Sequence, residues 1–321
     1  MLMATTPFTP VETPPLTRTS AAPTVQVTRA TLRDWLHLVR PPQWVKNFFV
    51  IAPLLFSGRA LEPYWVGRSL LAFVMFCLLA STIYLWNDAA DADADRAHPT
   101  KRQRPIAAGR IAKRQAIIVG MVLLAGALLL AWQLGPVVFA LAGTYVMLNI
   151  LYTWRLKEVV LLDVFAIAAF FLIRLLAGSA AIDVRASVWL LLCGGLLALY
   201  LGFTKRRHEL TLLGASSSEH RSVLSHYSTG FLDQMSSVLL SVTVVSYIMY
   251  TLSSETARQV GNDWLSYSTG FVLYGVFRYL YLVHKRNGGS PTKTLLTDRS
   301  LLVTVVLWVA YCGWVIYYHT V

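Results

Sequence analysis

The stretch VGRSLLAFVMFCLLASTIYLWNDAADADAD, residues 66–95, joins a long apolar segment to a run of carboxylates. A helix of roughly 20 apolar residues spans the hydrocarbon core of a bilayer. Residues 66–87 therefore predict a transmembrane helix. The acidic run that follows, residues 87–95, predicts that this helix ends at a polar membrane face, because charged side chains are unfavourable in lipid.

The same apolar pattern recurs along the chain. Of the 321 residues, 56% are hydrophobic and 14% are charged, which is more apolar side chain than one soluble core of this size can hold. Segments long enough to cross a membrane occur at 44–58, 66–87, 115–134, 136–153, 159–181, 187–204, 231–253, 264–284 and 300–320. The sequence thus predicts an all-α membrane protein of about nine transmembrane helices.

Basic residues gather in alternate loops between these segments. The loops after the second, fourth, sixth and eighth segments carry most of them. Such loops stay in the cytoplasm, so we expect the amino terminus inside and the carboxyl terminus outside. Residues 1–30, rich in Thr and Pro, predict a disordered cytoplasmic tail, and residues 31–321 predict one transmembrane domain. The net charge of +12 is then topological, and nucleic-acid binding is not expected.

The acidic run predicts a cation site. If the helix continues through it, Asp88, Asp91 and Asp95 recur at i, i+3 and i+7 on one stripe, with Asn87 beside Asp91. Three stacked carboxylates at a helix carboxyl end repel one another and the helix dipole, so a cation should compensate. Magnesium fits, because it takes oxygen ligands and is held by one or two carboxylates plus substrate phosphates. Asp93 points the opposite way, and a solvated ion pair is favoured for it.

Basic side chains follow directly. In HPTKRQRPIAAG, residues 98–109, two prolines break the helix and hold Lys101, Arg102 and Arg104 on a loop over the acidic stripe. Such side chains would neutralise a metal-bound diphosphate. Two alternatives remain open: a basic loop that serves only topology, and an acidic cap that is simply paired with Arg96, Lys101 and Arg102.

Further charged groups lie within the apolar segments, where each needs a partner or a wet cavity. Asp163 and Arg174 share a helical face and could line a central cavity, although Arg174 could equally bridge helices. Lys46 follows RPPQW at the start of the first segment, and Tyr84 stands one turn before Asp88. A phosphate-binding role for this pair is weighed against a snorkelling lysine and an interfacial tyrosine.

These motifs resemble the UbiA superfamily of intramembrane prenyltransferases, and within it the branch that transfers phosphoribosyl groups to polyprenyl phosphates. The resemblance covers nearly everything after about residue 30 and rests on RPPQWVKN (40–47), YLWNDAADADADRAHPTKRQRPIAAG (84–109), YTWRLK (152–157), FTKRRHEL (203–210) and YGVFRYLYLVH (274–284). It implies a helical bundle around a central cavity that opens to the cytoplasm and to lipid.

One departure from the superfamily pattern bears on the substrate. A usual member carries a second Asp-rich motif at the inner end of the sixth span, whereas this chain has KRRHE at 205–209. One acidic and one basic motif suit a single metal-bound diphosphate plus a second phosphate. Phosphoribosyl pyrophosphate has that distribution of charge.

The resemblance implies transfer of 5-phosphoribose from phosphoribosyl pyrophosphate to a decaprenyl-type polyprenyl phosphate. Pyrophosphate would be released, and the product would serve lipid-linked sugar synthesis for the cell envelope at the cytoplasmic side of a bacterial inner membrane. Asn87, Asp88, Asp91 and Asp95 would bind Mg²⁺, and the three aspartates would be catalytic. The implied substrate-binding residues are Lys46, Tyr84, Lys101, Arg104, Tyr152, Lys157, Asp163, Arg174, Lys205 and Arg206.

Two other functions are carried as alternatives. A prenyltransferase acting on an aromatic or other acceptor would share the acidic motif, but the missing second Asp-rich motif argues against it. A transporter or lipid carrier would use the intramembrane charges as a translocation path, and an internal repeat would favour it. A homo-oligomer is compatible with all of these functions.

Overall fold

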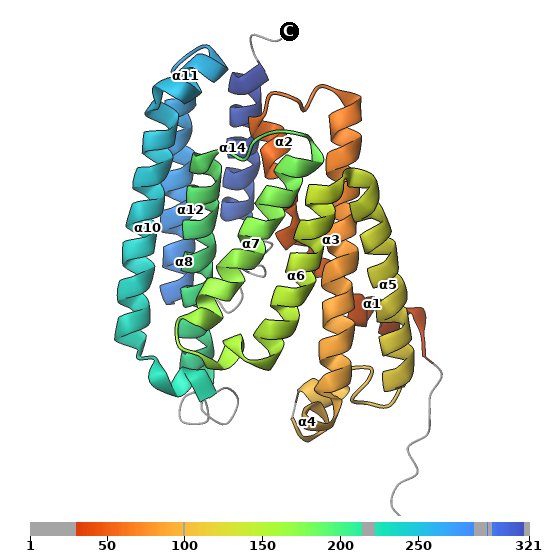
Figure 1. Ribbon diagram of the computed structural model, residues 1–321. Coiled ribbons are helices and arrows are strands. Elements are labelled where there is room, and N and C mark those ends of the chain that lie inside the picture. Colours follow the sequence, from red (N-terminus) through yellow and green to blue (C-terminus); the bar gives the residue numbers. More distant parts are fainter. Residues whose placement is uncertain (1–29, 99, 214–221, 286–293, 295–296, 318–321) are drawn as a thin grey trace, which may run out of the picture.

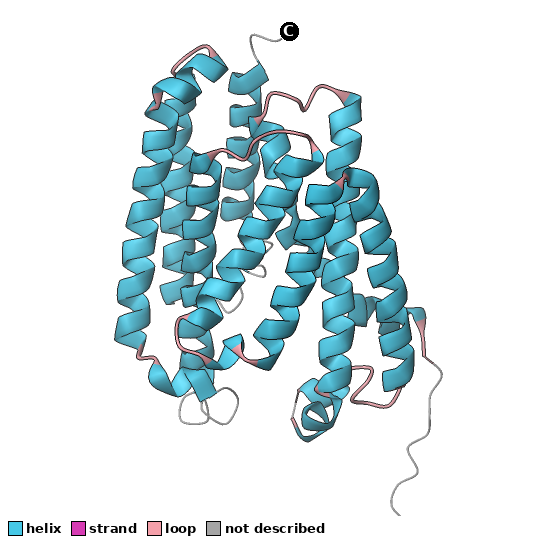
Figure 2. Cartoon of the chain, in the orientation of Figure 1, coloured by secondary structure: helices cyan, strands magenta, loops and turns pink. Residues whose placement is uncertain are grey.

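In the computed structural model (Figure 1), the described residues are 30–98, 100–213, 222–285, 294 and 297–317. These residues form helices joined by loops and turns, without strands (Figure 2). The prediction of an all-α protein is therefore confirmed. The predicted tail, 1–30, lies almost wholly outside the described residues.

Helices of very different length alternate along the chain. The α-helices are α1 (Leu32–Val39), α2 (Ala52–Phe56), α3 (Pro63–Ala90), α4 (Ala92–Ala97), α5 (Lys113–Leu134), α6 (Pro136–Trp154), α7 (Leu162–Ala181), α8 (Val188–Leu213), α10 (Thr229–Leu252), α11 (Ser254–Val260), α12 (Thr269–Lys285) and α14 (Arg299–Tyr317). Short 3-10 helices are η1 (Pro41–Val50), η2 (Lys101–Gln103), η3 (Leu156–Glu158), η5 (Ser222–His226) and η6 (Trp264–Ser268).

Within the described part of the chain, 7 helices are long and apolar enough to cross a membrane: α3, α5, α6, α7, α8, α10 and α14. The two other predicted spans differ from a long regular helix. The segment 44–58 consists of η1 and α2, because Pro41 and Pro42 open a 3-10 helix rather than an α-helix. The segment 264–284 consists of η6 and the 17 residues of α12. The count of nine stays a prediction.

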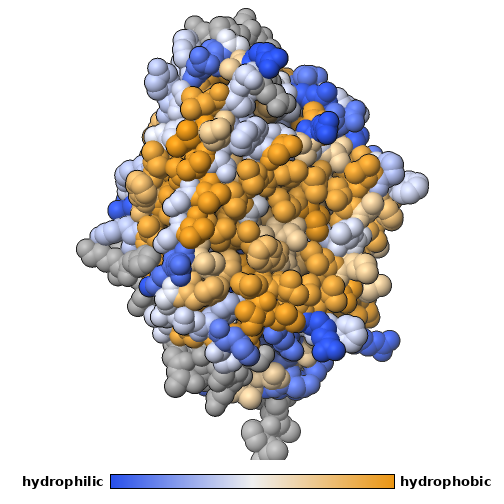
Figure 3. Space-filling model, turned by 60° about the vertical axis from the view of Figure 1, so that its left-hand side comes forward, coloured by the Kyte–Doolittle hydropathy of each residue, from blue (hydrophilic) through white to orange (hydrophobic). Residues whose placement is uncertain are grey.

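The outer surface of the bundle is apolar around its middle. Figure 3 shows a broad hydrophobic band between two hydrophilic ends. Large side chains such as Trp132, Met147 and Phe277 are exposed on the long helices. Only a lipid environment makes so large an apolar surface favourable, so the chain is a multi-pass membrane protein.

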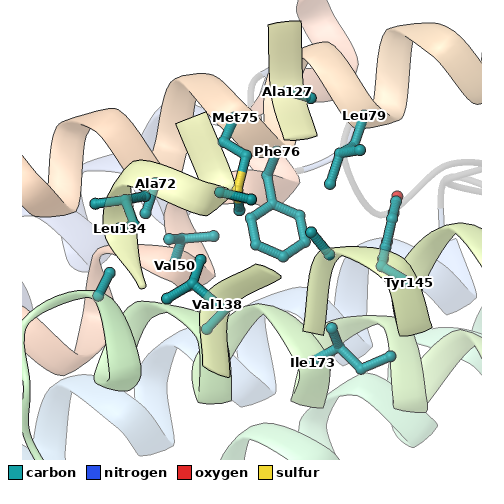
Figure 4. Packing of buried hydrophobic residues seen from close by; sticks show 14 of the residues in the cluster. Val50, Ala72, Met75, Phe76, Leu79, Ala127, Leu134, Val138, Tyr145 and Ile173 are labelled. Atoms are coloured by element: carbon teal, nitrogen blue, oxygen red, sulfur yellow. The ribbon is translucent and has the colours of Figure 1, made fainter. Parts of the chain in front are cut away.

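The irregular first segment is anchored in the middle of the bundle. Val50 of η1 packs with Met75, Phe76 and Tyr145 in the main core cluster (Figure 4). A Cβ added at Gly178 of α7 would stand 2.0 Å from the Val50 carbonyl oxygen, so only glycine allows the two backbones this close. This contact fixes η1 against α7 and thereby places the residues that precede Val50 beside the end of α3.

Candidate active site

The acidic run does not form one continuous helix. α3 ends at Ala90, Asp91 has φ −84° and ψ 1°, and α4 begins at Ala92. The predicted uninterrupted stripe over 87–95 is therefore wrong. Carboxylates at the carboxyl end of a long helix oppose its dipole, and a break at Asp91 relieves this by starting a new helix there. Asp91 becomes exposed, whereas Asp88 and Asp95 are only 4% and 3% exposed.

Two arginines bind the buried carboxylates. The Nη1 atom of Arg104 donates to Asp88 Oδ1 at 3.0 Å and to Asp95 Oδ2 at 2.7 Å. The Nη2 atom of Arg40 donates to the same Asp88 oxygen at 2.6 Å. Oxygens from two aspartates thus converge on one cationic nitrogen. The predicted position of Arg104 over the acidic residues is what the structure shows.

Arg40 was missed as a site residue by the sequence reasoning. It ends α1 with φ 54° and ψ 58°, a left-handed conformation that turns the chain into η1. Its guanidinium lies 4.8 Å from the centroid of the Tyr84 ring on α3. Its position directly before Pro41 and Pro42 is the signal that could have found it, because a helix tends to end just before a proline pair.

The oxygen donors near this point fit a magnesium ion. The carboxylates of Asp88 and Asp95 converge on Arg104. Asn87, the residue before Asp88, offers an amide oxygen, which accepts a hydrogen bond from the Thr153 hydroxyl at 3.3 Å. In the described residues, however, no three His, Cys, Asp or Glu side chains come together. Asp91 is exposed, unlike the buried pair Asp88 and Asp95. One or two carboxylates are nevertheless what Mg²⁺ takes when a substrate supplies phosphate oxygens.

Asp93 is held by ion pairs at the surface. Its carboxylate lies 2.6 Å from both Arg96 and Lys113, and the hydrogen bond from Lys113 lowers its pKa. The interpretation of Asp93 as a solvated ion pair is confirmed. This aspartate therefore differs from Asp88 and Asp95 in burial and in partner.

Lys46 lies among charges of its own sign. It is half-buried in η1 and forms no hydrogen bond or ion pair with any residue that the structure describes. The charged groups that act on it are Lys205, Arg174 and Arg40. These like charges repel the Lys46 ammonium group, which has no carboxylate partner of its own among the described residues. This arrangement favours an anion-binding role for Lys46 over simple snorkelling.

Arg174 bridges three elements in the interior. Its guanidinium donates to Asn47 Oδ1 at 2.9 Å, to the Phe170 carbonyl at 2.8 Å and to the Tyr145 hydroxyl at 2.9 Å. These acceptors come from η1, α7 and α6, and the Arg174 side chain is buried. These contacts support a structural role for Arg174 in bridging helices, which was one of the two roles that the sequence left open.

The basic motif at the end of α8 is largely neutralised by carboxylates. Arg206 and Asp163, both 0% exposed, are joined by a 2.6 Å ion pair. Arg206 also pairs with Glu209 and donates to the Tyr152 hydroxyl at 3.2 Å. Lys205 lies 3.8 Å from Glu209, and Arg207 pairs with Asp233. The substrate contacts predicted for Asp163, Tyr152 and Arg206 stay predictions, since these groups bind one another.

The remaining predicted basic residues lie on short helices at the same end of the bundle. Lys101 is exposed in η2, and Lys157 is half-buried in η3. In Figure 1, α4 lies at the bottom of the bundle, and the carboxyl end of α14 lies at the opposite end. Acidic and basic groups thus share one face, as the alternation of loop charge predicted.

These features define a class: a polytopic membrane protein with buried carboxylates and a cluster of cations at one membrane face. Residues 48–304 match the UbiA prenyltransferase family, and the chain belongs to it. It is 32% identical over 308 residues to decaprenyl-phosphate phosphoribosyltransferase of Mycolicibacterium smegmatis, covering 93% of this chain and 97% of that protein. The protein of that name in Corynebacterium glutamicum is 31% identical, over 84% of this chain and 83% of its own length.

The fold agrees with solved structures of the family. A UbiA homolog from Archaeoglobus fulgidus, bound to GPP and Mg²⁺, superposes with a TM-score of 0.65 at 17% sequence identity. The match covers 88% of this chain and 99% of that one. The predicted UbiA-like bundle is thereby confirmed.

Proposed function

We propose that this protein transfers 5-phosphoribose from phosphoribosyl pyrophosphate to a decaprenyl-type polyprenyl phosphate and releases pyrophosphate. The observation that carries the proposal is the separation of charge at the site. Two buried carboxylates, Asp88 and Asp95, suit a metal-bound diphosphate, and Lys46, which has no carboxylate partner among the described residues, lies within the influence of the cations Lys205, Arg174 and Arg40. The names of the relatives that match nearly the whole chain agree with it. The site would lie at the cytoplasmic face of a bacterial plasma membrane.

Magnesium would be held by Asp88 and Asp95, with Asn87 and Asp91 nearby. When bound, it supplies charge stabilisation for the departing diphosphate. The chain itself contributes cations to the same end, since Arg40 and Arg104 carry guanidinium groups that bind phosphate oxygens in paired hydrogen bonds.

The remaining residues would orient the two substrates. Lys46 would bind a phosphate, and the exposed Lys101 and Lys205 and the half-buried Lys157 would attract the donor electrostatically. Carboxylates beside the ribose would stabilise positive charge at its C1 atom as the bond to diphosphate breaks. The acceptor phosphate is already an anion, so the reaction needs no strong general base.

A transfer assay tests the proposal. Purified protein in detergent, incubated with Mg²⁺, radiolabelled phosphoribosyl pyrophosphate and decaprenyl phosphate, should move the label into the lipid extract. Label that stays in the aqueous phase, while a prenyl diphosphate is transferred to an aromatic acceptor, would identify the prenyltransferase alternative instead. Transport of unchanged label into vesicles would identify the carrier.

Matched aspartates test the metal assignment. Asp95→Asn should abolish turnover and leave the protein folded, because a neutral amide binds Mg²⁺ more weakly than a carboxylate does. Asp93→Asn is the control, since Asp93 lies two residues away and is held by Arg96 and Lys113. Full activity in the Asp95 variant, or equal loss in both variants, would remove the assignment.

A further inference from the structure

Arg104 and Arg40 bind the carboxylate oxygens that the proposed metal would need. Asp88 Oδ1 accepts from both arginines, and Asp95 Oδ2 accepts from Arg104 alone. From this we infer that the two arginines and the divalent cation exchange places. The cation enters together with the diphosphate, and the arginines then move from the carboxylates to the phosphate oxygens. The inference rests on the proposed function, because it takes the metal-bound diphosphate as the ligand.

The charges at the site favour an exchange of the arginines for the metal over binding of the metal with the arginines still in place. Asp88 and Asp95 carry two negative charges, and Arg40 and Arg104 carry two positive charges, so the group is neutral. A bare divalent cation would leave two uncompensated positive charges in a partly buried place, which is strongly unfavourable. A diphosphate that arrives with the metal supplies the anionic oxygens that the displaced arginines require.

Both arginines lie where a side chain can move. Their side chains are 30% and 25% exposed, whereas the carboxylates that they bind are 4% exposed. Arg40 sits at the junction of α1 and η1, and Arg104 ends η2. The Tyr84 ring, 4.8 Å from the Arg40 guanidinium, offers that cation a second contact that does not involve a carboxylate. The buried carboxylates are thus held in place, and the arginine side chains are the groups that move.

Metal binding without catalysis tests this exchange. Mn²⁺ alone is titrated into the purified protein and followed by electron paramagnetic resonance, and binding of radiolabelled pyrophosphate in the presence of Mn²⁺ is measured by equilibrium dialysis. Arg104→Gln should bind Mn²⁺ at least about tenfold more tightly than the unmodified protein, because two charge-assisted hydrogen bonds no longer compete. The same variant should bind pyrophosphate more weakly. Arg40→Gln should shift both affinities less, since Arg40 contacts one carboxylate.

Two further variants separate contact from overall charge. Arg102→Gln removes an exposed arginine in the same short helix that forms no ion pair with a described residue, and it should leave Mn²⁺ affinity unchanged. Arg104→Lys keeps the charge but has no fork of donors, so its affinities should fall between those of the parent and Arg104→Gln. It also serves if Arg104→Gln folds poorly.

The outcomes distinguish this inference from the proposed function. Mn²⁺ binding to the parent protein with no gain in Arg104→Gln, or with an equal gain in Arg102→Gln, would overturn the exchange and leave the metal site standing. Absence of Mn²⁺ binding in every variant, even with pyrophosphate, would overturn the metal site and the exchange together. Opposite shifts of metal and pyrophosphate affinity in the Arg104 variant are the result that supports the exchange.

Discussion

Replacement of Arg206 by methionine should strongly destabilise the protein. The change removes the guanidinium that binds Asp163 at 2.6 Å, Glu209, and the Tyr152 hydroxyl at 3.2 Å. Asp163 is 0% exposed and would keep one side-chain hydrogen bond, from the Tyr227 hydroxyl at 2.7 Å. Breaking a buried ion pair on one side costs about 3–5 kcal/mol, because the remaining charge is left uncompensated.

The double variant separates the stranded charge from the lost contacts. In Asp163→Asn with Arg206→Met, the buried carboxylate is gone, so only the lost hydrogen bonds remain, at about 1 kcal/mol each. Three lost hydrogen bonds account for about 3 kcal/mol of the loss, so we expect the second substitution to recover up to about 2 kcal/mol, the part due to the uncompensated charge. The free energy of unfolding is measured by titration with sodium dodecyl sulfate in mixed micelles.

The neighbouring Lys205 provides the control. It is 46% exposed and pairs with Glu209 at 3.8 Å, so Lys205→Met should change the free energy of unfolding by less than about 1 kcal/mol. Two results would refute the reasoning. One is an Arg206→Met variant whose free energy of unfolding lies within about 1 kcal/mol of the parent, which is the effect of an exposed ion pair. The other is a double variant less stable than the single one, since either result means that Asp163 is solvated.

Two further predictions concern packing and pH. Gly178→Ala should lower the free energy of unfolding by about 1–3 kcal/mol in the same titration, because its Cβ would meet the Val50 carbonyl oxygen at 2.0 Å. Gly143→Ala should not lower it, because a Cβ added at Gly143 would have no neighbouring atom within 4 Å. Hydrogen bonds from Thr31 lower the pKa of Asp34 from 3.8 to about 2. Its stabilising contribution is therefore present above about pH 4 and is lost between pH 4 and 2, so Asp34→Asn and the parent should converge in stability there.

Much of the helical framework could be predicted from hydropathy alone. The predicted span 66–87 lies within α3, and 159–181 nearly coincides with α7, because about 20 apolar residues in succession have few alternatives to a membrane helix. The break at Asp91 could not be predicted in this way. Periodicity treats every residue as a continuation of the last turn, whereas the break depends on carboxylates that oppose the helix dipole.

The candidate site was predicted less completely than the fold. Residue types identified Asp88, Asp95 and Arg104 correctly as neighbours, since they are close in the chain. Sequence does not reveal which distant groups neutralise a charge, so the pairing of Arg206 with Asp163, 43 residues away, was unforeseen. Arg40 was missed for a related reason, because it contacts Asp88 across 48 residues of chain.

At Arg40 an unfavourable backbone conformation carries the guanidinium that reaches Asp88. Glycine would adopt φ 54° there without steric conflict, and so would remove roughly 1 kcal/mol of strain. Relief of backbone strain alone would favour Arg40→Gly, but the same substitution would delete a cation beside the buried carboxylates. Engineered versions of this protein intended for inhibitor screening should therefore keep position 40 fixed, because a choice guided by backbone strain alone would remove a charge from the site.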